Sequence, residues 1–289
     1  MMIVDLYGPT TQRACALNAF LFERSRRMSL LEARSVTVIR GGQSILDAAS
    51  IQAHAGEWVG VIGPNGSGKT SLLRVLSGSW TPDAGSVHFR GQHLNGWSHR
   101  DRARHLAVVK QAPHVAFDFT VRELVMLGRA PYRGWMQSFT DEDHAHVNEA
   151  LRTMDLVPLA HRTVPSLSGG ERQRTFLAQA LVQTPTAWLL DEPTAHLDIQ
   201  YKLSFFQHLK ERQTASETVV AVVHDLEHAA RFADRLVLLH QGRVAVEGAP
   251  TQVLTRNHLA EVFGVEATPT NTPHGLRLHV HGPAAPASL

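Results

Sequence analysis

One glycine-rich segment limits the choice of fold more than any other part of the sequence. It reads Gly63-Pro64-Asn65-Gly66-Ser67-Gly68-Lys69-Thr70 and satisfies the pattern G-x-x-x-x-G-K-[ST]. Before it lies Trp58–Ile62, a short and continuously apolar run, typical of a strand buried on both faces in a parallel sheet. After it, leucines and a valine recur at helical spacing in residues 72–76. Strand, turn and helix together predict an α/β fold.

The residue types of this segment, called the cradle below, suit the binding of phosphate. Glycines let successive backbone N–H groups curl around phosphate oxygens, and the following helix adds its positive N-terminal end. We expect Lys69 to reach the β- and γ-phosphates of a nucleotide and the Thr70 hydroxyl to face Mg²⁺.

An acidic pair, Asp191 and Glu192, follows the apolar run of residues 187–190. An Asp at the end of such a strand can hold Mg²⁺ through its water shell, and the adjacent Glu can deprotonate the attacking water. An isolated Asp-Glu pair is more often the opening of a solvated loop. With the cradle present, the pattern favours Asp191 as a metal residue and Glu192 as the general base.

The rest of the chain divides into regions of different pattern. Residues 30–40 and 45–51 alternate apolar with polar residues around Gly41-Gly42, which predicts an antiparallel pair of strands. Thr120 and Glu123 form a capping box, and helical patterns dominate from there to about Leu159, which predicts a helical lobe over about residues 112–166. Residues 1–28 are expected to be a disordered extension or a misannotated start. Residues 268–289, rich in Pro, Thr, Asn and His, are expected to be a loose tail.

The most specific motif is Leu167-Ser168-Gly169-Gly170-Glu171-Arg172-Gln173, called the serine–glycine segment below. Ser168 and Glu171 form a capping box, so that a helix begins here and offers bare N–H groups to an anion. On these residues the chain resembles the ATP-binding subunits of ABC transporters, over residues 29–267. The resemblance implies a P-loop NTPase core with a parallel sheet, an antiparallel β subdomain and an inserted helical lobe. It also implies that Ser168, Gly169 and Gly170 bind the γ-phosphate of ATP held by a second copy.

The resemblance assigns roles to four further residues. Gln111 matches the glutamine that contacts Mg²⁺ and senses the γ-phosphate, and His224 matches the switch histidine that touches that phosphate. Asp198 matches the aspartate of the loop that communicates across the dimer. Arg40 stands where many relatives place a tyrosine that stacks on adenine, with no aromatic residue nearby in the sequence. A guanidinium plane can itself stack on a purine.

The implied function is that of an ATPase that powers transport. Each copy supplies half of two sites, so hydrolysis requires a two-fold homodimer. The partners implied are two transmembrane permease subunits, docked near residues 112–140, and an extracytoplasmic substrate-binding protein. Three strings resemble importers of haem, ferric siderophores or cobalamin: residues 117–121, 128–132 and 194–198. The alternative is a soluble ABC ATPase of DNA repair or translation, a class that typically has a coiled-coil insertion or two cassettes, of which the sequence shows neither.

Composition bears on compartment and partners. The net charge, 28 − 26 = +2, and the scattered basic residues argue against a nucleic-acid partner. Apolar runs fall far short of the roughly 18 to 20 residues of a spanning helix, so we expect that the chain does not cross a bilayer by itself. The resemblance implies a peripheral subunit on the cytoplasmic face of the inner or plasma membrane. The single cysteine fits a reducing compartment. Two histidine pairs, His144 with His146 and His279 with His281, leave open a regulatory metal site.

Overall fold

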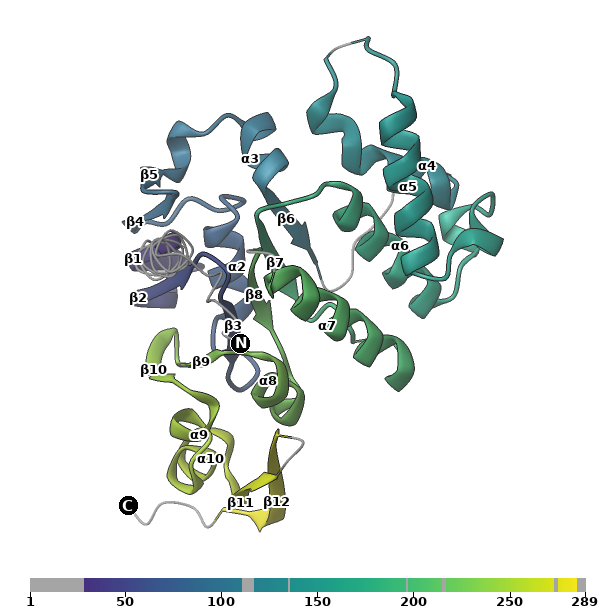
Figure 1. Cartoon of the computed structure of the whole chain (residues 1–289). Coiled ribbons are helices and arrows are strands. Elements are labelled where there is room, and N and C mark those ends of the chain that lie inside the picture. Colours follow the sequence, from purple (N-terminus) through teal and green to yellow (C-terminus); the bar gives the residue numbers. More distant parts are fainter. Residues whose placement is uncertain are drawn as a thin grey trace, which may run out of the picture.

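The computed structural model describes residues 29–110, 117–134, 136–195, 197–214, 217–272 and 275–284. At its centre is a six-stranded sheet that lies between a smaller antiparallel sheet and a helical lobe (Figure 1). Its strands, from edge to edge, are β10 (Arg243–Gly248), β9 (Arg235–His240), β3 (Trp58–Ile62), β8 (Thr218–Val222), β7 (Ala187–Asp191) and β6 (Leu106–Val109). Only β10 runs antiparallel to its neighbour.

The central strands are buried because their sequences are apolar throughout. Every residue of β3, β7 and β8 is buried, which matches their place between two covering layers. The helices beside the sheet are α2 (Lys69–Leu76), α3 (His99–His105), α7 (Ile199–Thr214) and α8 (Leu226–Phe232). The predicted parallel sheet is therefore confirmed.

The antiparallel sheet has the order β2-β1-β4-β5. Its strands are β1 (Ser29–Arg40), β2 (Gln43–His54), β4 (Ala84–Phe89) and β5 (Gln92–His93). The predicted pairing around Gly41-Gly42 is confirmed, because Arg40 pairs with Gln43 across that turn. One face of this sheet packs on α2 and on the central sheet through a shared apolar cluster that includes Leu46, Leu72 and Val237.

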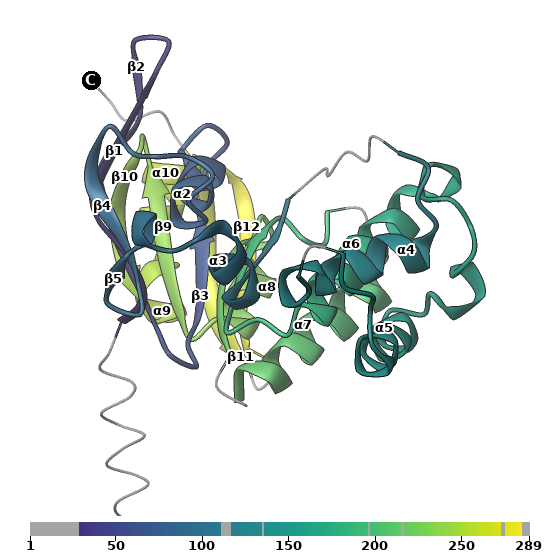
Figure 2. The same cartoon turned by 90° about the horizontal axis from the view of Figure 1, so that it is seen from above.

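The helical lobe extends to one side of the molecule, away from the antiparallel sheet (Figure 2). It contains α4 (Val121–Met126), α5 (Asp141–Thr153) and α6 (Gly169–Val182), with short 3-10 turns at Leu127–Tyr132, Val157–Leu159 and Val164–Ser166. The Thr120–Glu123 capping box that begins α4 is confirmed. α6 packs on α4 and α5 through one apolar cluster. The bounds of about 112–166 given to the lobe stay a prediction.

A buried ion-pair cluster fixes the start of α5. Asp143 is fully buried and accepts from Arg129 Nε at 2.9 Å and from Arg133 Nη2 at 2.6 Å. Burial alone would raise the pKa of Asp143, but the hydrogen bonds from Arg133, Thr140 and Arg129 outweigh it and hold that pKa well below its ordinary value. The cluster ties the 3-10 turn at Leu127–Tyr132 to α5.

The C-terminal region is more ordered than the sequence suggested. After α9 (Pro250–Val253) and α10 (Arg256–Phe263), strands β11 (Val265–Thr272) and β12 (Gly275–Pro283) form an antiparallel hairpin. Glu227 on α8 pairs with Arg277 and accepts the backbone N–H of Leu278, and Leu276 is buried. Residues 268–272 and 275–283 therefore do not form the loose tail that was predicted for residues 268–289, because α8 and the core supply partners that lie far away in the sequence.

Candidate functional site

The cradle lies where three parallel strands end. β3 leads directly into it, and the neighbouring strands β8 and β7 end beside it with His224 and the acidic pair. Carboxyl ends of adjacent parallel strands meet at one edge of a sheet, which is where α/β proteins bind ligands. The sequence predicted these segments separately, and the topology brings them to one edge.

Glycine is required at two positions of the cradle by close packing. A Cβ on Gly63 would lie 2.1 Å from the carbonyl oxygen of Leu239, and one on Gly68 would lie 2.8 Å from that of Ile45. Gly68 also adopts a left-handed conformation and caps α2 without any side-chain hydrogen bond. The first N–H groups of α2 therefore have no intrahelical partner and no side-chain cap, an arrangement suited to phosphate oxygens. Pro64, Asn65 and Gly66 form the outer part of the same loop.

Lys69 is held by the loop that precedes it. Its ammonium donates to the carbonyl oxygens of Gly63 at 2.9 Å and Pro64 at 2.8 Å, and the residue is buried. Burial lowers the pKa of Lys69, while the carboxylates of Glu192 and Asp191 favour its charged form. A positive charge that has lost much of its hydration is well placed to bind phosphate.

Thr70 and Asp191, each predicted to face Mg²⁺, lie side by side. The Thr70 hydroxyl donates to Asp191 Oδ1 at 3.1 Å, across 121 residues of sequence. Burial raises the pKa of Asp191, which the hydrogen bond from Thr70 opposes only in part. A buried carboxylate beside a hydroxyl is a hard oxygen donor set, and a divalent cation would relieve the cost of burying its charge. These residues fit Mg²⁺.

Glu192 follows with unusual backbone geometry. Its φ is 49°, in the left-handed region that residues with a Cβ seldom occupy, and its N–H donates to Val222 O at 3.2 Å. The Glu192 carboxylate contacts Nε2 of His224, with side-chain exposures of 12% and 49%. The structure thus brings together Lys69, Thr70, Asp191, Glu192 and His224.

The serine–glycine segment lies at the start of α6. Ser168 Oγ accepts from Glu171 N at 3.3 Å and Glu171 Oε2 accepts from Ser168 N at 2.8 Å, so the predicted capping box is confirmed. Hydrogen bonds with the backbone N–H and the side chain of Ser168 lower the pKa of Glu171. Gly169 and Gly170 form the first turn of the helix, which is exposed on its outer side.

One residue of this segment has a role that the sequence did not reveal. Gln173 is buried, and its amide donates to Pro193 O at 2.8 Å, directly after the acidic pair. The contact ties the serine–glycine segment to the loop that carries Glu192. In the sequence, Gln173 is visible only as a polar residue on the inner face of the predicted helix, and this does not indicate which residue it contacts.

Two further predicted residues, Asp198 and Arg40, lie on other segments of the described structure. Asp198 precedes α7, with its side chain exposed beside Ile199, which is 74% exposed. Arg40 turns toward Trp80, with the guanidinium carbon 5.1 Å from the ring centroid. Trp80 is far from Arg40 in the sequence but lies beside it in space, because the chain returns to the end of β1 just before β4. Gln111 lies outside the described residues.

Comparison with known proteins assigns the family. The family model described as ABC transporter matches residues 46–195. The chain belongs to the ABC transporter family. Its ATP-binding subunits hydrolyse ATP, so the chain is an ATPase.

Relatives of known name are similar over most of the chain. The hemin import ATP-binding protein HmuV of Rhodococcus jostii is 41% identical over 234 residues, covering 81% of this chain and 80% of the relative. The cobalamin import ATP-binding protein BtuD of Halobacterium salinarum is also 41% identical, covering 81% of this chain and 58% of the relative. Both relatives are named as import proteins, which does not favour the alternative of a soluble ABC ATPase that acts in DNA repair or translation.

Solved structures agree with the fold. A bacterial ABC transporter cassette, solved as a dimer, superimposes with a TM-score of 0.70 at 29% identity, covering 76% of this chain and 99% of the cassette. The same cassette was solved as a dimer bound to ADP and Pi, with a TM-score of 0.69 at 27% identity and the same coverage. A P-loop NTPase core with an antiparallel subdomain and a helical lobe is therefore confirmed.

Two expectations concern features outside the nucleotide site. Within the described ranges, no helix combines the length and apolarity needed to span a bilayer. Nor do three His, Cys, Asp or Glu side chains of the described residues gather as a metal site requires. The histidine pairs thus gain no support as ligands, and His144 with His146 lies on α5 rather than in an extended segment.

Proposed function

We propose that ATP is hydrolysed at a site composed of two copies of this chain. One copy supplies the cradle, Asp191 and Glu192, and the other supplies Ser168, Gly169 and Gly170 at the capped start of α6. The observation that carries the proposal is the meeting of the acidic pair with Thr70 and His224 beside Lys69. A relative of similar fold solved as a dimer supports the two-fold arrangement.

The roles of the residues follow from their chemistry. The N–H groups of the cradle and the Lys69 ammonium neutralise phosphate charge. Thr70 and Asp191 would hold Mg²⁺, which when bound would offset phosphate charge. Glu192 accepts the proton of the attacking water, and His224 holds that carboxylate in position and contacts the γ-phosphate. Gln111 is proposed to contact Mg²⁺, and Asp198 to couple the two copies.

Hydrolysis is proposed to drive an importer of haem, a ferric siderophore or cobalamin. The names of the hemin and cobalamin import relatives support this class of cargo. The ATPase itself does not hold the cargo, so the assignment rests on similarity rather than on a site in this chain. An extracytoplasmic substrate-binding protein is proposed to deliver the cargo.

Two transmembrane permease subunits are proposed to dock on the helical lobe near residues 112–140, which would hold the chain at the cytoplasmic face of the membrane. A hollow of about 390 Å³ between β6 and α6 supports a docking surface here, with Val108 and Leu127 on its lining. The side chains of Val108 and Leu127 are 41% and 39% exposed. Large apolar side chains exposed beside a hollow are typical of protein contact sites.

The test is purification of the tagged chain from membranes of its own cells, followed by identification of what accompanies it. We expect a permease and a substrate-binding protein, and uptake of the cargo that fails when Glu192 is changed to Gln. Recovery with ribosomal or DNA-repair proteins and no permease would support the alternative class instead.

A further inference from the structure

The charge of the chain is unevenly distributed. Residues 84–140 contain eight Lys or Arg and three Asp or Glu, a net charge of 8 − 3 = +5, whereas the whole chain has a net charge of +2. The remaining residues therefore have a net charge of 2 − 5 = −3. An asymmetry of this kind is typical of a protein that meets an anionic surface on one side.

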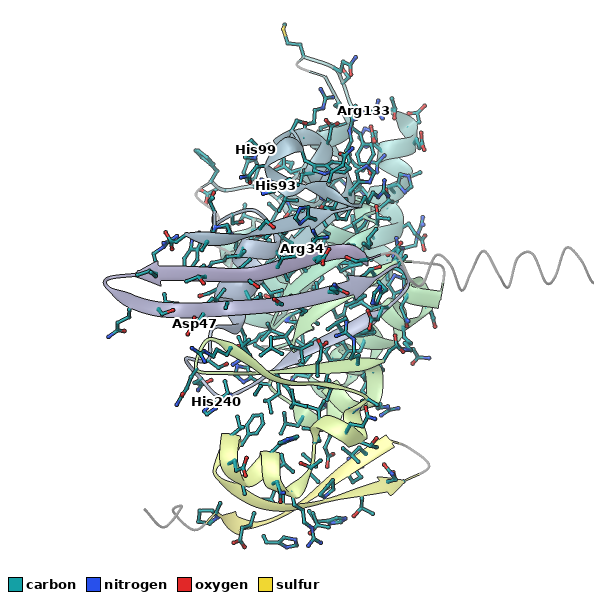
Figure 3. All side chains as sticks on the ribbon, turned by 90° about the vertical axis from the view of Figure 1, so that its left-hand side faces the viewer. Arg34, Asp47, His93, His99, Arg133 and His240 are labelled. Carbon is teal, nitrogen blue, oxygen red and sulfur yellow. The ribbon has the colours of Figure 1, made fainter. Side chains whose placement is uncertain are left out.

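The described parts of residues 84–140 form one end of the molecule, called the basic end below. This end contains β5 and β6, which are the edge strands of the two sheets, and α3, which lies between them in the chain. Figure 1 shows α3 and the helical lobe at the top and the C-terminal hairpin at the bottom. In Figure 3, His93, His99 and Arg133 lie toward the end that carries α3, and His240 lies toward the opposite end. The excess of positive charge thus lies on the side where both sheets end.

Two exposed arginines of the basic end are held by neutral oxygens. Arg90 Nη2 donates to Thr186 Oγ1 at 3.0 Å. Arg100 Nε donates to Pro131 O at 2.9 Å, and its Nη2 donates to Arg133 O at 2.6 Å. A neutral acceptor fixes the position of a guanidinium without cancelling its charge, and the remaining N–H groups can still donate. Both side chains are therefore able to bind an anion from outside the chain.

A large apolar side chain is exposed at the same end. Met136, on the loop that leads into α5, is 92% exposed. The carbonyl groups that hold Arg100 belong to Pro131 and Arg133, at the start of this loop, so that the basic and the apolar side chains belong to one surface. Positive charge combined with exposed apolar side chains is typical of proteins that lie on a membrane interface. The phosphates of a nucleic acid offer no apolar partner for Met136, whereas the boundary between lipid headgroups and acyl chains does.

We propose that the basic end contacts the anionic phospholipid headgroups of the membrane in which the permease lies. Arg90 and Arg100 meet the headgroup phosphates, and Met136 enters the boundary between headgroups and acyl chains. The inference rests on the proposed function, because docking of the permease turns this end toward the membrane. Pro131, whose carbonyl binds Arg100, also lines the hollow between β6 and α6 where the permease is proposed to dock.

The test is co-sedimentation of the full chain with lipid vesicles in the absence of permease. Vesicles of phosphatidylcholine with about 30% phosphatidylglycerol should bind the chain at least about tenfold more tightly than phosphatidylcholine alone, and about 0.5 M salt should release it. R90Q and R100Q should each weaken binding about fivefold, because each basic residue near an anionic surface contributes about that factor. M136S should weaken binding about threefold or more, because an apolar side chain is lost from the lipid boundary.

The matched controls lie at the opposite end of the molecule (Figure 1). R256Q removes the charge of an exposed arginine on α10, and V280S removes an apolar side chain that is 65% exposed on β12. Both should leave vesicle binding unchanged. R90Q decides between the outcomes, because R100Q also loses its contacts with the loop before α5.

Equal binding to both kinds of vesicle, or equal effects of R90Q and R256Q, would overturn the inference. Release by about 10 mM inorganic phosphate at constant ionic strength would overturn it in favour of a site for soluble anions. Tighter binding to a DNA duplex at the same phosphate concentration would overturn it in favour of a nucleic-acid surface. Recovery of the permease is measured separately, so a chain that recruits the permease but does not bind anionic vesicles would refute this inference alone. A chain that binds the vesicles but recruits no permease would refute the proposed docking instead.

Discussion

Replacing Glu192 by Gln removes a proton acceptor while keeping the shape of the side chain. The Glu192 side chain is only 12% exposed and contacts His224, so an amide can occupy the same space and keep that contact. The cradle, Lys69 and Asp191 are unchanged, and ATP binding should therefore stay within about threefold of the wild type. Only the step that needs the base is affected.

The size of the effect follows from the chemistry of proton transfer. A positioned general base contributes about 10²- to 10⁴-fold to a rate. The amide of Gln cannot accept the proton, so we expect turnover to fall by about 10²-fold or more, which is about 2.7 kcal/mol in the barrier. The trapped nucleotide should also stabilise an ATP-bound dimer.

The assay is phosphate release at saturating ATP and Mg²⁺, with ATP affinity measured separately on the same preparation. The matched control is E261Q, the same chemical change at an exposed position on α10, which should leave both quantities unchanged. Near-normal turnover of E192Q would remove Glu192 from the role of base. Loss of ATP affinity along with turnover would point instead to a structural role of the strained backbone at this residue.

Three further predictions concern other parts of the molecule. K69A should lose most of its nucleotide affinity by equilibrium binding, because a buried ammonium contact to phosphate is removed; unchanged affinity would refute that contact. S168R should leave binding by a single copy intact but abolish hydrolysis that depends on dimer formation, and an unchanged rate would contradict a shared site. D143N should lower the free energy of unfolding at pH 7 by about 3–5 kcal/mol in chemical denaturation, because Arg129 and Arg133 lose their buried partner. Because the pKa of Asp143 is lower in the folded chain, its charge stabilises the fold above a pH of about 4, the unfolded pKa, and this effect is lost as the pH falls. The difference in unfolding free energy between wild type and D143N should therefore shrink in acid. A difference that does not depend on pH would contradict the charge of Asp143.

Features carried by contiguous residues were predictable from the sequence. The cradle is one uninterrupted motif, and both capping boxes place their partners three residues apart. The strands β3, β7 and β8 are apolar throughout because both of their faces are covered. In each of these cases the physical cause is local, so a short window of sequence contains it.

Features that depend on distant partners were not predictable. The sequence does not show that Gln173 contacts Pro193 or that Arg40 contacts Trp80, because each contact joins residues that are far apart along the chain. Likewise, the polar composition of β11 and β12 suggested a loose end, whereas Glu227 on α8 supplies the pairing that orders them. The role of the Ser168 region is still less visible, since its proposed ligand lies on another copy.

A cross-linking measurement tests the composite site most directly. In an E192Q chain whose only native cysteine is removed by C15S, the changes N65C and S168C place one thiol in the cradle and one in the serine–glycine segment. With ATP and Mg²⁺, a mild oxidant should give a covalent dimer on a non-reducing gel, and without nucleotide the chain should remain a monomer. A chain that stays monomeric with ATP, or that cross-links equally without it, would contradict a site shared between two copies.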